Sequence, residues 1–120
     1  MIFVGGGGNL GWNYRESGSA RVDASGPNVN DGNWHHIAVS YKRDGNAITF
    51  LDGVLVNTTP IGPAEETLDS GMPTNIGQDG AGDYSPAIDA LIDDVAIWRR
   101  AVTGFELARI YTFGTNGVKV

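Results

Sequence analysis

The chain has 120 residues, 41% of them hydrophobic and 18% charged, and a formal net charge of −6 at pH 7. This length suits one domain with a buried core, so residues 1–120 are expected to form a single domain. The acidic balance excludes nucleic-acid binding, which needs clustered Lys and Arg. No apolar run is long enough to span a membrane. The absence of cysteine excludes disulfides, thiol catalysis and thiolate zinc sites.

Short segments of alternating apolar and polar residues predict β-strands along most of the chain. They are residues Leu10–Tyr14, Ala20–Ala24, His35–Tyr41, Ile48–Leu51, Val54–Val56, Thr74–Gly77 and Ala90–Trp98. The dipeptide Asp52-Gly53 predicts a tight hairpin, because both of its positions tolerate positive φ. Clusters of Gly, Asn and Asp separate the segments, and no strand–helix alternation is present. The pattern is therefore typical of an all-β antiparallel sandwich.

One helix is expected near the C-terminus. Thr103 and Glu106 have the spacing of a capping box, in which each side chain satisfies an exposed amide of the other residue. Apolar residues then recur at helical spacing from Phe105 to Tyr111. A single short amphipathic helix follows from this pattern.

Four phrases, in this order, resemble the laminin G-like branch of the concanavalin A-like lectin/glucanase superfamily. They are Asp31–Tyr41 with its Trp-His-His, the hairpin Ile48–Val56, Ile76-Gly77, and Leu91–Trp98 followed by Arg99–Thr103 and the helix. The resemblance implies a jelly-roll β-sandwich. By comparison with the family pattern, these phrases correspond to its second half, which implies that the opening strands are missing. A sandwich truncated in this way exposes a strand edge and an apolar face.

This departure from the family pattern has two interpretations. The open edge can pair with a second copy, which predicts a homodimer or a swapped oligomer. Alternatively, the chain is a naturally reduced variant that closes with fewer strands. We favour self-association.

Three aromatic residues are candidates for carbohydrate binding. Trp12 and Tyr14 share one face of a predicted strand and are flanked by Asn13 and Arg15, so they offer a pyranose a flat apolar surface and hydrogen-bonding neighbours. The same face carries Leu10, and a core position for both rings is the favoured interpretation. Tyr84 lies in a glycine-rich loop, where aromatic residues commonly bind ligands.

Three other aromatic or imidazole positions are interpreted as structural. For Trp34 a core position is favoured over a sugar platform. His35 has the parity of the inward residues of its strand, whereas His36 faces the other way, so the two cannot share a metal ion. Trp98 is expected to pack in the fold.

The carboxylates of the sequence fit calcium binding better than glycoside hydrolysis. The resemblance makes Asp93 a candidate ligand of a structural Ca2+, and Asp79 and Asp83 form a second oxygen-rich candidate at a glycine turn. Solvated turn aspartates are the favoured alternative for both sets. None of the four glutamates belongs to the paired arrangement that glycosidases require.

The resemblance therefore implies a non-catalytic module that binds a glycan or polysaccharide, within a larger extracellular protein. Two alternatives stay open. The domain can act in adhesion or self-assembly through protein–protein contact, or it can be an inactive fragment of a glycoside hydrolase whose catalytic strand lies elsewhere. Fold alone does not decide between them.

Overall fold

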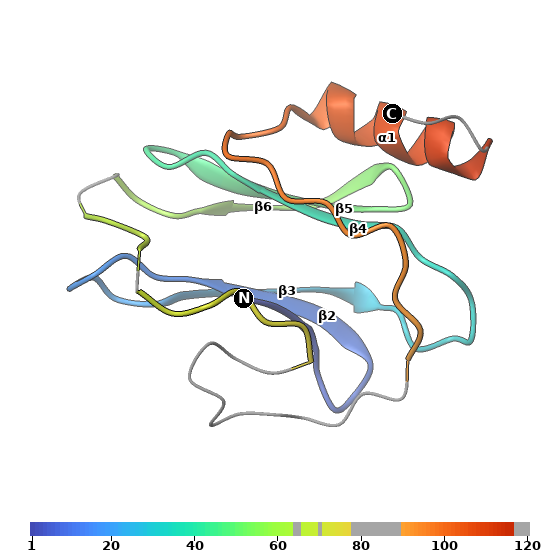
Figure 1. Cartoon of the computed structure of the whole chain (residues 1–120), viewed down its shortest axis with the longest axis horizontal. Coiled ribbons are helices and arrows are strands. Elements are labelled where there is room, and N and C mark those ends of the chain that lie inside the picture. The colour runs from blue at the N-terminus through green and yellow to red at the C-terminus, as the bar shows by residue number, and fades with distance from the viewer. Residues whose placement is uncertain (64–65, 70, 78–89, 117–120) are drawn as a thin grey trace.

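The computed structural model describes residues 1–63, 66–69, 71–77 and 90–116. These residues form three layers, in which two three-stranded sheets lie face to face and a helix covers the outer side of the second sheet (Figure 1). Within the described residues, no helix is long and apolar enough to cross a membrane.

The first sheet, called sheet A, is made of three antiparallel strands from the N-terminal part of the chain. They are β1 (Ile2–Val4), β2 (Asn9–Tyr14) and β3 (Val22–Asn28), with β2 in the middle. A Cβ atom at Gly11 on β2 would lie 2.6 Å from the ring of Phe3 on β1. Glycine is therefore required for the close approach of these two strands.

The second sheet, called sheet B, is an antiparallel meander of β4 (Ile37–Tyr41), β5 (Asn46–Leu51) and β6 (Val54–Pro60), with β5 in the middle. The turn between β5 and β6 is the predicted Asp-Gly hairpin. Asp52 has a φ of 51° and Gly53 a φ of 76°, as expected for a primed two-residue turn.

The two sheets enclose an aromatic core. Its buried members are Trp12 and Tyr14 from β2, Ala47 from β5, and Ile61. Tyr41 of β4 packs against both rings, edge-on to Trp12 and stacked on Tyr14. The indole N–H of Trp12 donates to the hydroxyl of Thr49, so the polar end of this buried ring is satisfied.

A second core lies between sheet B and the helix α1 (Gly104–Thr115). Phe50 of β5, Val102 and Leu107 are its buried members. Since Ala47 faces sheet A and Phe50 faces the helix, β5 is buried on both sides. This explains the nearly continuous apolar character of its sequence.

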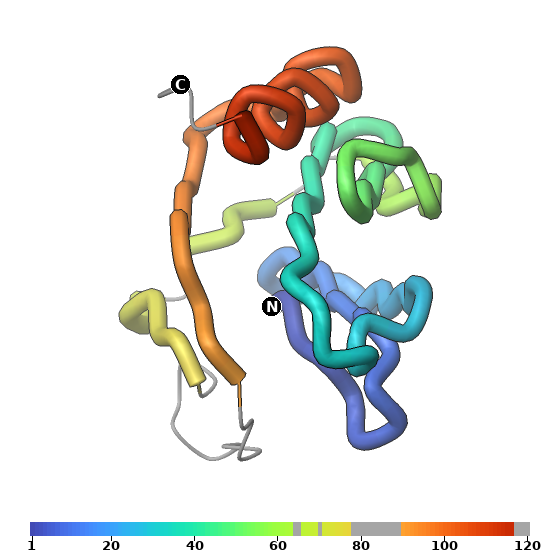
Figure 2. Tube along the Cα trace, turned by 90° about the vertical axis from the view of Figure 1, so that its right-hand side faces the viewer, coloured from blue at the N-terminus to red at the C-terminus, as the bar shows by residue number. Residues whose placement is uncertain are grey.

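The expected all-β sandwich with one C-terminal helix is confirmed, with differences in detail. Sequence analysis missed the short strand β1, and it predicted strands at Thr74–Gly77 and Ala90–Trp98 that the structure does not contain. Residues 90–98 follow a course of their own beside the two sheets (Figure 2). Among the described residues, their backbone makes no hydrogen bond with a strand, and Asp94 has a φ of 50°, so no strand forms there.

Candidate functional site

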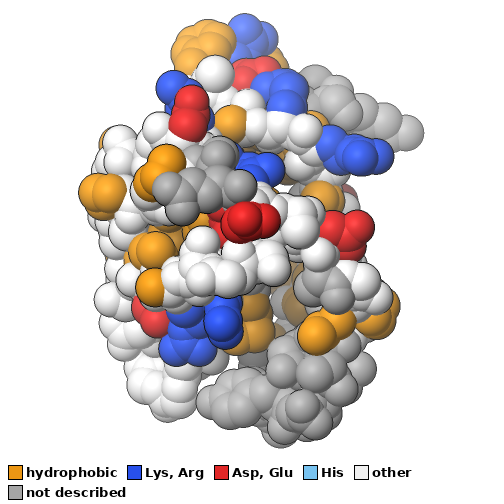
Figure 3. All heavy atoms as spheres, turned by 90° about the vertical axis from the view of Figure 1, so that its left-hand side faces the viewer, with side chains coloured by type: hydrophobic (Ala, Val, Ile, Leu, Met, Phe, Trp, Pro, Cys, Tyr) orange, Lys and Arg blue, Asp and Glu red, His pale blue; other side chains and the backbone are white. Residues whose placement is uncertain are grey.

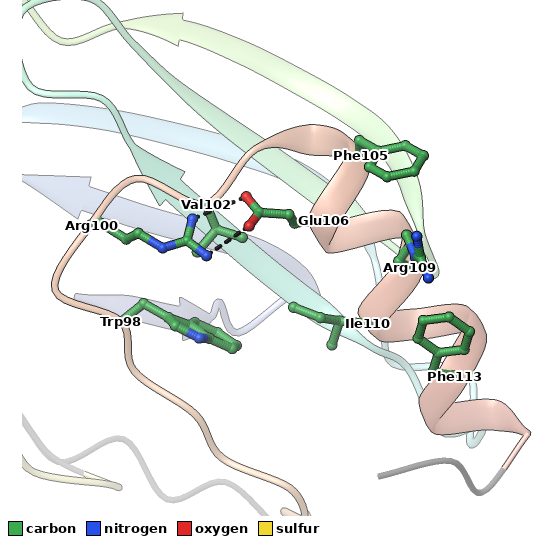
Figure 4. A pocket seen from close by; sticks show the side chains of 8 residues that line it. All are labelled: Trp98, Arg100, Val102, Phe105, Glu106, Arg109, Ile110 and Phe113. Atoms are coloured by element: carbon green, nitrogen blue, oxygen red, sulfur yellow. Dashed lines mark hydrogen bonds and ion pairs between the residues drawn. The ribbon is translucent and has the colours of Figure 1, made fainter. Parts of the chain in front are cut away.

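The start of α1 is fixed by the predicted capping box. The amide of Glu106 donates to the Thr103 hydroxyl at 3.3 Å, and the amide of Thr103 donates to a Glu106 carboxylate oxygen at 2.8 Å. These two bonds satisfy exposed donors at the helix N-terminus. Trp98, Arg100 and Val102, in the chain that leads to this cap, lie beside the helix (Figure 4).

A hollow of about 300 Å³ lies between this segment and the helix; we call it the α1 hollow. It is lined by Trp98, Arg100, Val102, Phe105, Glu106, Arg109, Ile110 and Phe113. Glu106 and Ile110 point from the helix towards Arg100 and Trp98 (Figure 4). In the space-filling view of Figure 3, charged and apolar side chains lie side by side at the top of the molecule, where the helix runs.

A two-pronged ion pair crosses the rim of the hollow. Arg100 binds the Glu106 carboxylate through Nη2 at 2.7 Å and through Nη1 at 3.0 Å. Arg100, together with the hydrogen bonds from Thr103, lowers the pKa of Glu106 to about 2. The same carboxylate raises the pKa of Arg100. Both groups are therefore ionised at physiological pH and hold each other in one orientation.

On the outer face of the helix, a guanidinium group lies between two aromatic rings. The guanidinium of Arg109 lies 5.5 Å from the ring centre of Phe105 and 4.8 Å from that of Phe113. The three residues are four positions apart, so they share one helix face. The cation–π contacts restrain Arg109 and leave its N–H groups available.

These groups fit the chemistry of a sugar ring. Trp98 is 45% exposed and offers an apolar ring face, with Ile110 opposite it. Arg100 also donates to the Ala101 carbonyl through Nη1 at 3.3 Å, and its remaining N–H groups are donors for hydroxyl oxygens. The volume lies at the small end of the range for ligand sites, about 300–1,000 Å³. A short stretch of glycan at the surface matches this size.

A second polar cluster is centred on His35 and holds the loop before β4. Its Nδ1 lies 2.8 Å from an Asp52 carboxylate oxygen, and its Nε2 lies 3.0 Å from one of Asp31. The hydrogen bond to Asp52, followed by that to Asp31, raises the pKa of His35. Asp52 also accepts from the amide of His36 at 2.9 Å. The cluster therefore ties the hairpin turn to the β4 entry, which is a structural role.

A third cluster surrounds the buried carboxylate of Glu16, of which only 3% is exposed. Glu16 accepts from the Tyr14 hydroxyl, from Arg43 at 3.0 Å and from the amide of Glu66 at 2.8 Å. These donors compensate the cost of burying a charge. Glu16 therefore connects sheet A to Arg43, in the β4–β5 turn, and to the chain that follows β6.

The family model of the concanavalin A-like lectin/glucanases superfamily matches residues 1–108, which is most of the chain. The chain belongs to this superfamily. The resemblance carried by the four sequence phrases is thereby confirmed, and the match reaches back to the first residue.

One solved structure shares the fold of this concanavalin A-like domain. It is a crystal structure of residues 221–444 of an S-layer domain-containing protein from Clostridium thermocellum, with a TM-score of 0.58 and 21% sequence identity. The similarity covers 87% of this chain and 52% of that one, so the domain spans about half of its structural neighbour. No match was found among curated proteins.

The predicted sugar platform of Trp12 and Tyr14 is corrected by the positions of the two rings. Trp12 is 1% exposed and Tyr14 is 7% exposed. Tyr41 covers one side of each ring, and the Tyr14 hydroxyl is engaged with Glu16. Neither residue has a ring face free for a sugar, and the core interpretation, favoured from the sequence, describes both.

The remaining predicted site residues are not brought together by the described structure. Tyr84, Asp79 and Asp83 lie outside the described residues. Asp93 is exposed, and its carboxylate accepts a hydrogen bond from the amide of Asp94 at 2.9 Å. In the part of the chain that is described, no three His, Asp or Glu side chains are grouped to hold a metal. Calcium binding by Asp93 therefore stays a prediction that needs further ligands.

The core position expected for Trp34 is wrong, because its side chain is 67% exposed in the loop before β4. His35 points away from solvent as expected, with 15% of its side chain exposed, and its ring nitrogens bind the carboxylates of Asp52 and Asp31. His36 lies on the opposite face, against the ring of Tyr111. The predicted separation of the two histidines is confirmed.

Sequence reasoning missed the α1 hollow. The signal was present in two patterns: Trp98 precedes a pair of arginines just before a capping box, and Phe105, Arg109 and Phe113 recur at intervals of four. Trp98 was assigned to packing, and the helical repeat was interpreted as an ordinary amphipathic helix. The ion pair between Arg100 and Glu106 brings the two patterns together. It was not apparent in the sequence, because the two residues are six positions apart.

Proposed function

We propose that this domain is a non-catalytic carbohydrate-recognition module that binds a glycan or polysaccharide in the α1 hollow. One observation carries the proposal: a half-exposed tryptophan, Trp98, lies beside the oriented ion pair of Arg100 and Glu106. A ring face takes up the C–H surface of a pyranose, and the fixed pair offers both donors and acceptors to its hydroxyls. Membership of a lectin/glucanase superfamily supports this use.

A binding role is favoured over hydrolysis by the carboxylates of the hollow. Glycosidases need two carboxyl groups on either side of the scissile bond, one of them often with a raised pKa. Glu106 is the one carboxylate among the residues that line the hollow, and Arg100 lowers its pKa. Such a group is a poor proton donor at neutral pH.

We place the domain outside the cell, as one part of a larger protein. The support is the family and the name of the structural neighbour, an S-layer domain-containing protein. Polysaccharides are accessible to a module in that location.

The test is a glycan array followed by titration calorimetry with the best oligosaccharide. Trp98→Ala is expected to weaken binding about tenfold, which corresponds to about 1.4 kcal/mol. Trp34→Ala is the matched control, since Trp34 is also exposed and lies outside the hollow. Loss of binding in the Trp34 variant alone, or an array without any bound glycan, would contradict the proposal.

Adhesion by self-assembly is a second candidate function, and a different observation favours it. Residues 91–98 expose five large apolar side chains: Leu91, Ile92, Val95, Ile97 and Trp98. Several large apolar side chains exposed on one short segment are characteristic of a surface that binds another protein.

A further inference from the structure

The extended segment 90–98 is unusual for an exposed stretch of chain. Leu91 is 81% exposed and Ile97 is 75% exposed. In the described structure, the backbone of these residues makes no hydrogen bond to another backbone group. Unpaired amides and carbonyls beside exposed apolar side chains form a template for an added strand. The segment therefore has the properties of a strand without its partner.

We infer that this segment pairs with the same segment of a second copy, antiparallel, about a two-fold axis at Ala96. The inference goes beyond glycan binding and identifies the surface and register of assembly. A two-fold axis through an antiparallel pair brings one residue opposite its own copy, and the neighbours then pair in mirror order on a shared face.

In this register, charged residues lie opposite residues of opposite charge, and apolar residues lie opposite apolar residues. With Ala96 on the axis, Asp93 lies opposite Arg99 of the other copy, and Val95 lies opposite Ile97. By symmetry each pair occurs twice, so one face reads Asp, Val, Ile, Arg against Arg, Ile, Val, Asp. Opposite charges and branched apolar side chains are favourable cross-strand pairs.

The groups required for these pairs are available. In the described residues, neither Asp93 nor Arg99 has an ion-pair partner, whereas Arg100 is already engaged by Glu106. A register with its axis at Asp94 places Asp93 opposite Val95 and Arg99 opposite Asp89, which lies outside the described residues. A shift with its axis at Ile97 pairs Val95 with Arg99. Of these three registers, the one with its axis at Ala96 pairs Asp93 with Arg99, the two charges that have no ion-pair partner among the described residues.

One residue must change conformation for pairing. Asp94 has a φ of 50°, in the left-handed region that residues other than glycine avoid. An added strand would return Asp94 to the extended conformation that it prefers. The interruption at Asp94 is thus relieved by the same event that satisfies the backbone groups of the segment.

The charge pair gives the first test, by sedimentation equilibrium and light scattering of the 120-residue chain. Asp93→Arg and Arg99→Asp each place like charges opposite each other and should weaken the dimer at least tenfold. An equimolar mixture of the two variants restores both opposite-charge pairs and should form a heterodimer. Arg21→Asp, at the residue just before β3, makes the same charge change as Arg99→Asp and should leave the association unchanged.

Cysteine cross-linking gives the second test, since the chain contains no cysteine. In Ala96→Cys the two thiols face each other across the axis, at a Cα separation of about 4.5–5.5 Å that a disulfide spans. Two cysteines at Val95 lie diagonally, about 7–8 Å apart, and should cross-link poorly. A covalent dimer from Ala96→Cys with little from Val95→Cys is the expected result.

The outcomes separate the two proposals. A monomeric wild-type chain, a mixture of charge variants without heterodimer, or equal cross-linking at both cysteines would overturn the inferred pairing. These outcomes are also expected if a different segment of a longer protein, and not a second copy of this segment, pairs with residues 90–98. None of these variants changes a residue that lines the α1 hollow. Glycan binding that persists in them would show that the recognition site stands independently of assembly.

Discussion

Trp12 and Trp98 occupy segments with the same alternating pattern, yet one is 1% exposed and the other 45%. Trp12 lies on β2, between two hydrogen-bonded neighbours, and its ring is closed in by sheet B. Trp98 lies on a segment that no described strand pairs with. The difference shows that alternation determines which side chains share a face. Burial of that face depends on a partner elsewhere in the fold.

The largest expected effect is that of removing the buried indole. Trp12→Ala should lower the free energy of unfolding by about 3–5 kcal/mol, because it leaves a cavity between the sheets. Trp98→Ala should cost about 1 kcal/mol, since much of that ring is already in water. Urea denaturation followed by circular dichroism measures both.

Trp12→Phe keeps the comparison usable if Trp12→Ala does not fold. It retains most of the apolar volume but removes the N–H that binds Thr49, whose buried hydroxyl then loses a partner. A loss of about 1–3 kcal/mol is expected. A larger loss for Trp98→Ala than for Trp12→Ala would contradict the assignment of the two regions.

The fold was predictable from the sequence wherever the evidence was local. The Asp52-Gly53 turn and the Thr103–Glu106 capping box need only the residues beside them, and both were found in the expected form. The resemblance carried by the four phrases also predicted the β-sandwich. The unpaired course of residues 90–98 was not predictable, because strand pairing depends on a segment distant in sequence.

The candidate site was less predictable, for a related reason. A large aromatic side chain looks the same in the sequence whether it fills a core or binds a ligand. Trp34 and Trp98 turned out to be more exposed than expected, and Trp12 and Tyr14 proved to be buried as the favoured interpretation held. What distinguishes them is the covering layer, which no local pattern encodes.

A smaller effect tests how firmly the helix is attached to sheet B. Gly53 has a φ of 76°, and a Cβ atom there would lie 2.6 Å from the Tyr111 ring of α1. Gly53→Ala should therefore cost about 1–3 kcal/mol through backbone strain, and more through the clash. Thermal and urea unfolding measure the loss.

Gly62→Ala is the matched control for the backbone contribution. Gly62 has a φ of 79°, and nothing lies within 4 Å of its added Cβ atom. The excess loss at Gly53 then reports the contact with α1, and Tyr111→Leu should reduce that excess. If the two alanine variants lose the same stability, the helix does not press on the hairpin.

The smallest effect concerns adjacent histidines that face the two sides of sheet B. Hydrogen bonds to the carboxylates of Asp52 and Asp31 raise the pKa of His35, whereas burial lowers the pKa of His36. His35 therefore contributes stability that is fully present below its unfolded pKa of about 6.5 and is lost as the pH rises through its folded pKa. His36 contributes stability that is present above about pH 6.5 and is lost as the pH falls through its folded pKa.

The two variants His35→Gln and His36→Gln should accordingly show opposite pH dependence. Relative to wild type, His35→Gln should be most destabilised at pH 5 and approach wild type at pH 8.5. The deficit of His36→Gln should be largest at pH 8.5 and shrink at pH 5, because the variant avoids charging a buried ring whose Nδ1 has no partner. Parallel pH profiles for the two variants would show that both histidines share one environment, and the two faces of sheet B would then differ less than their packing indicates.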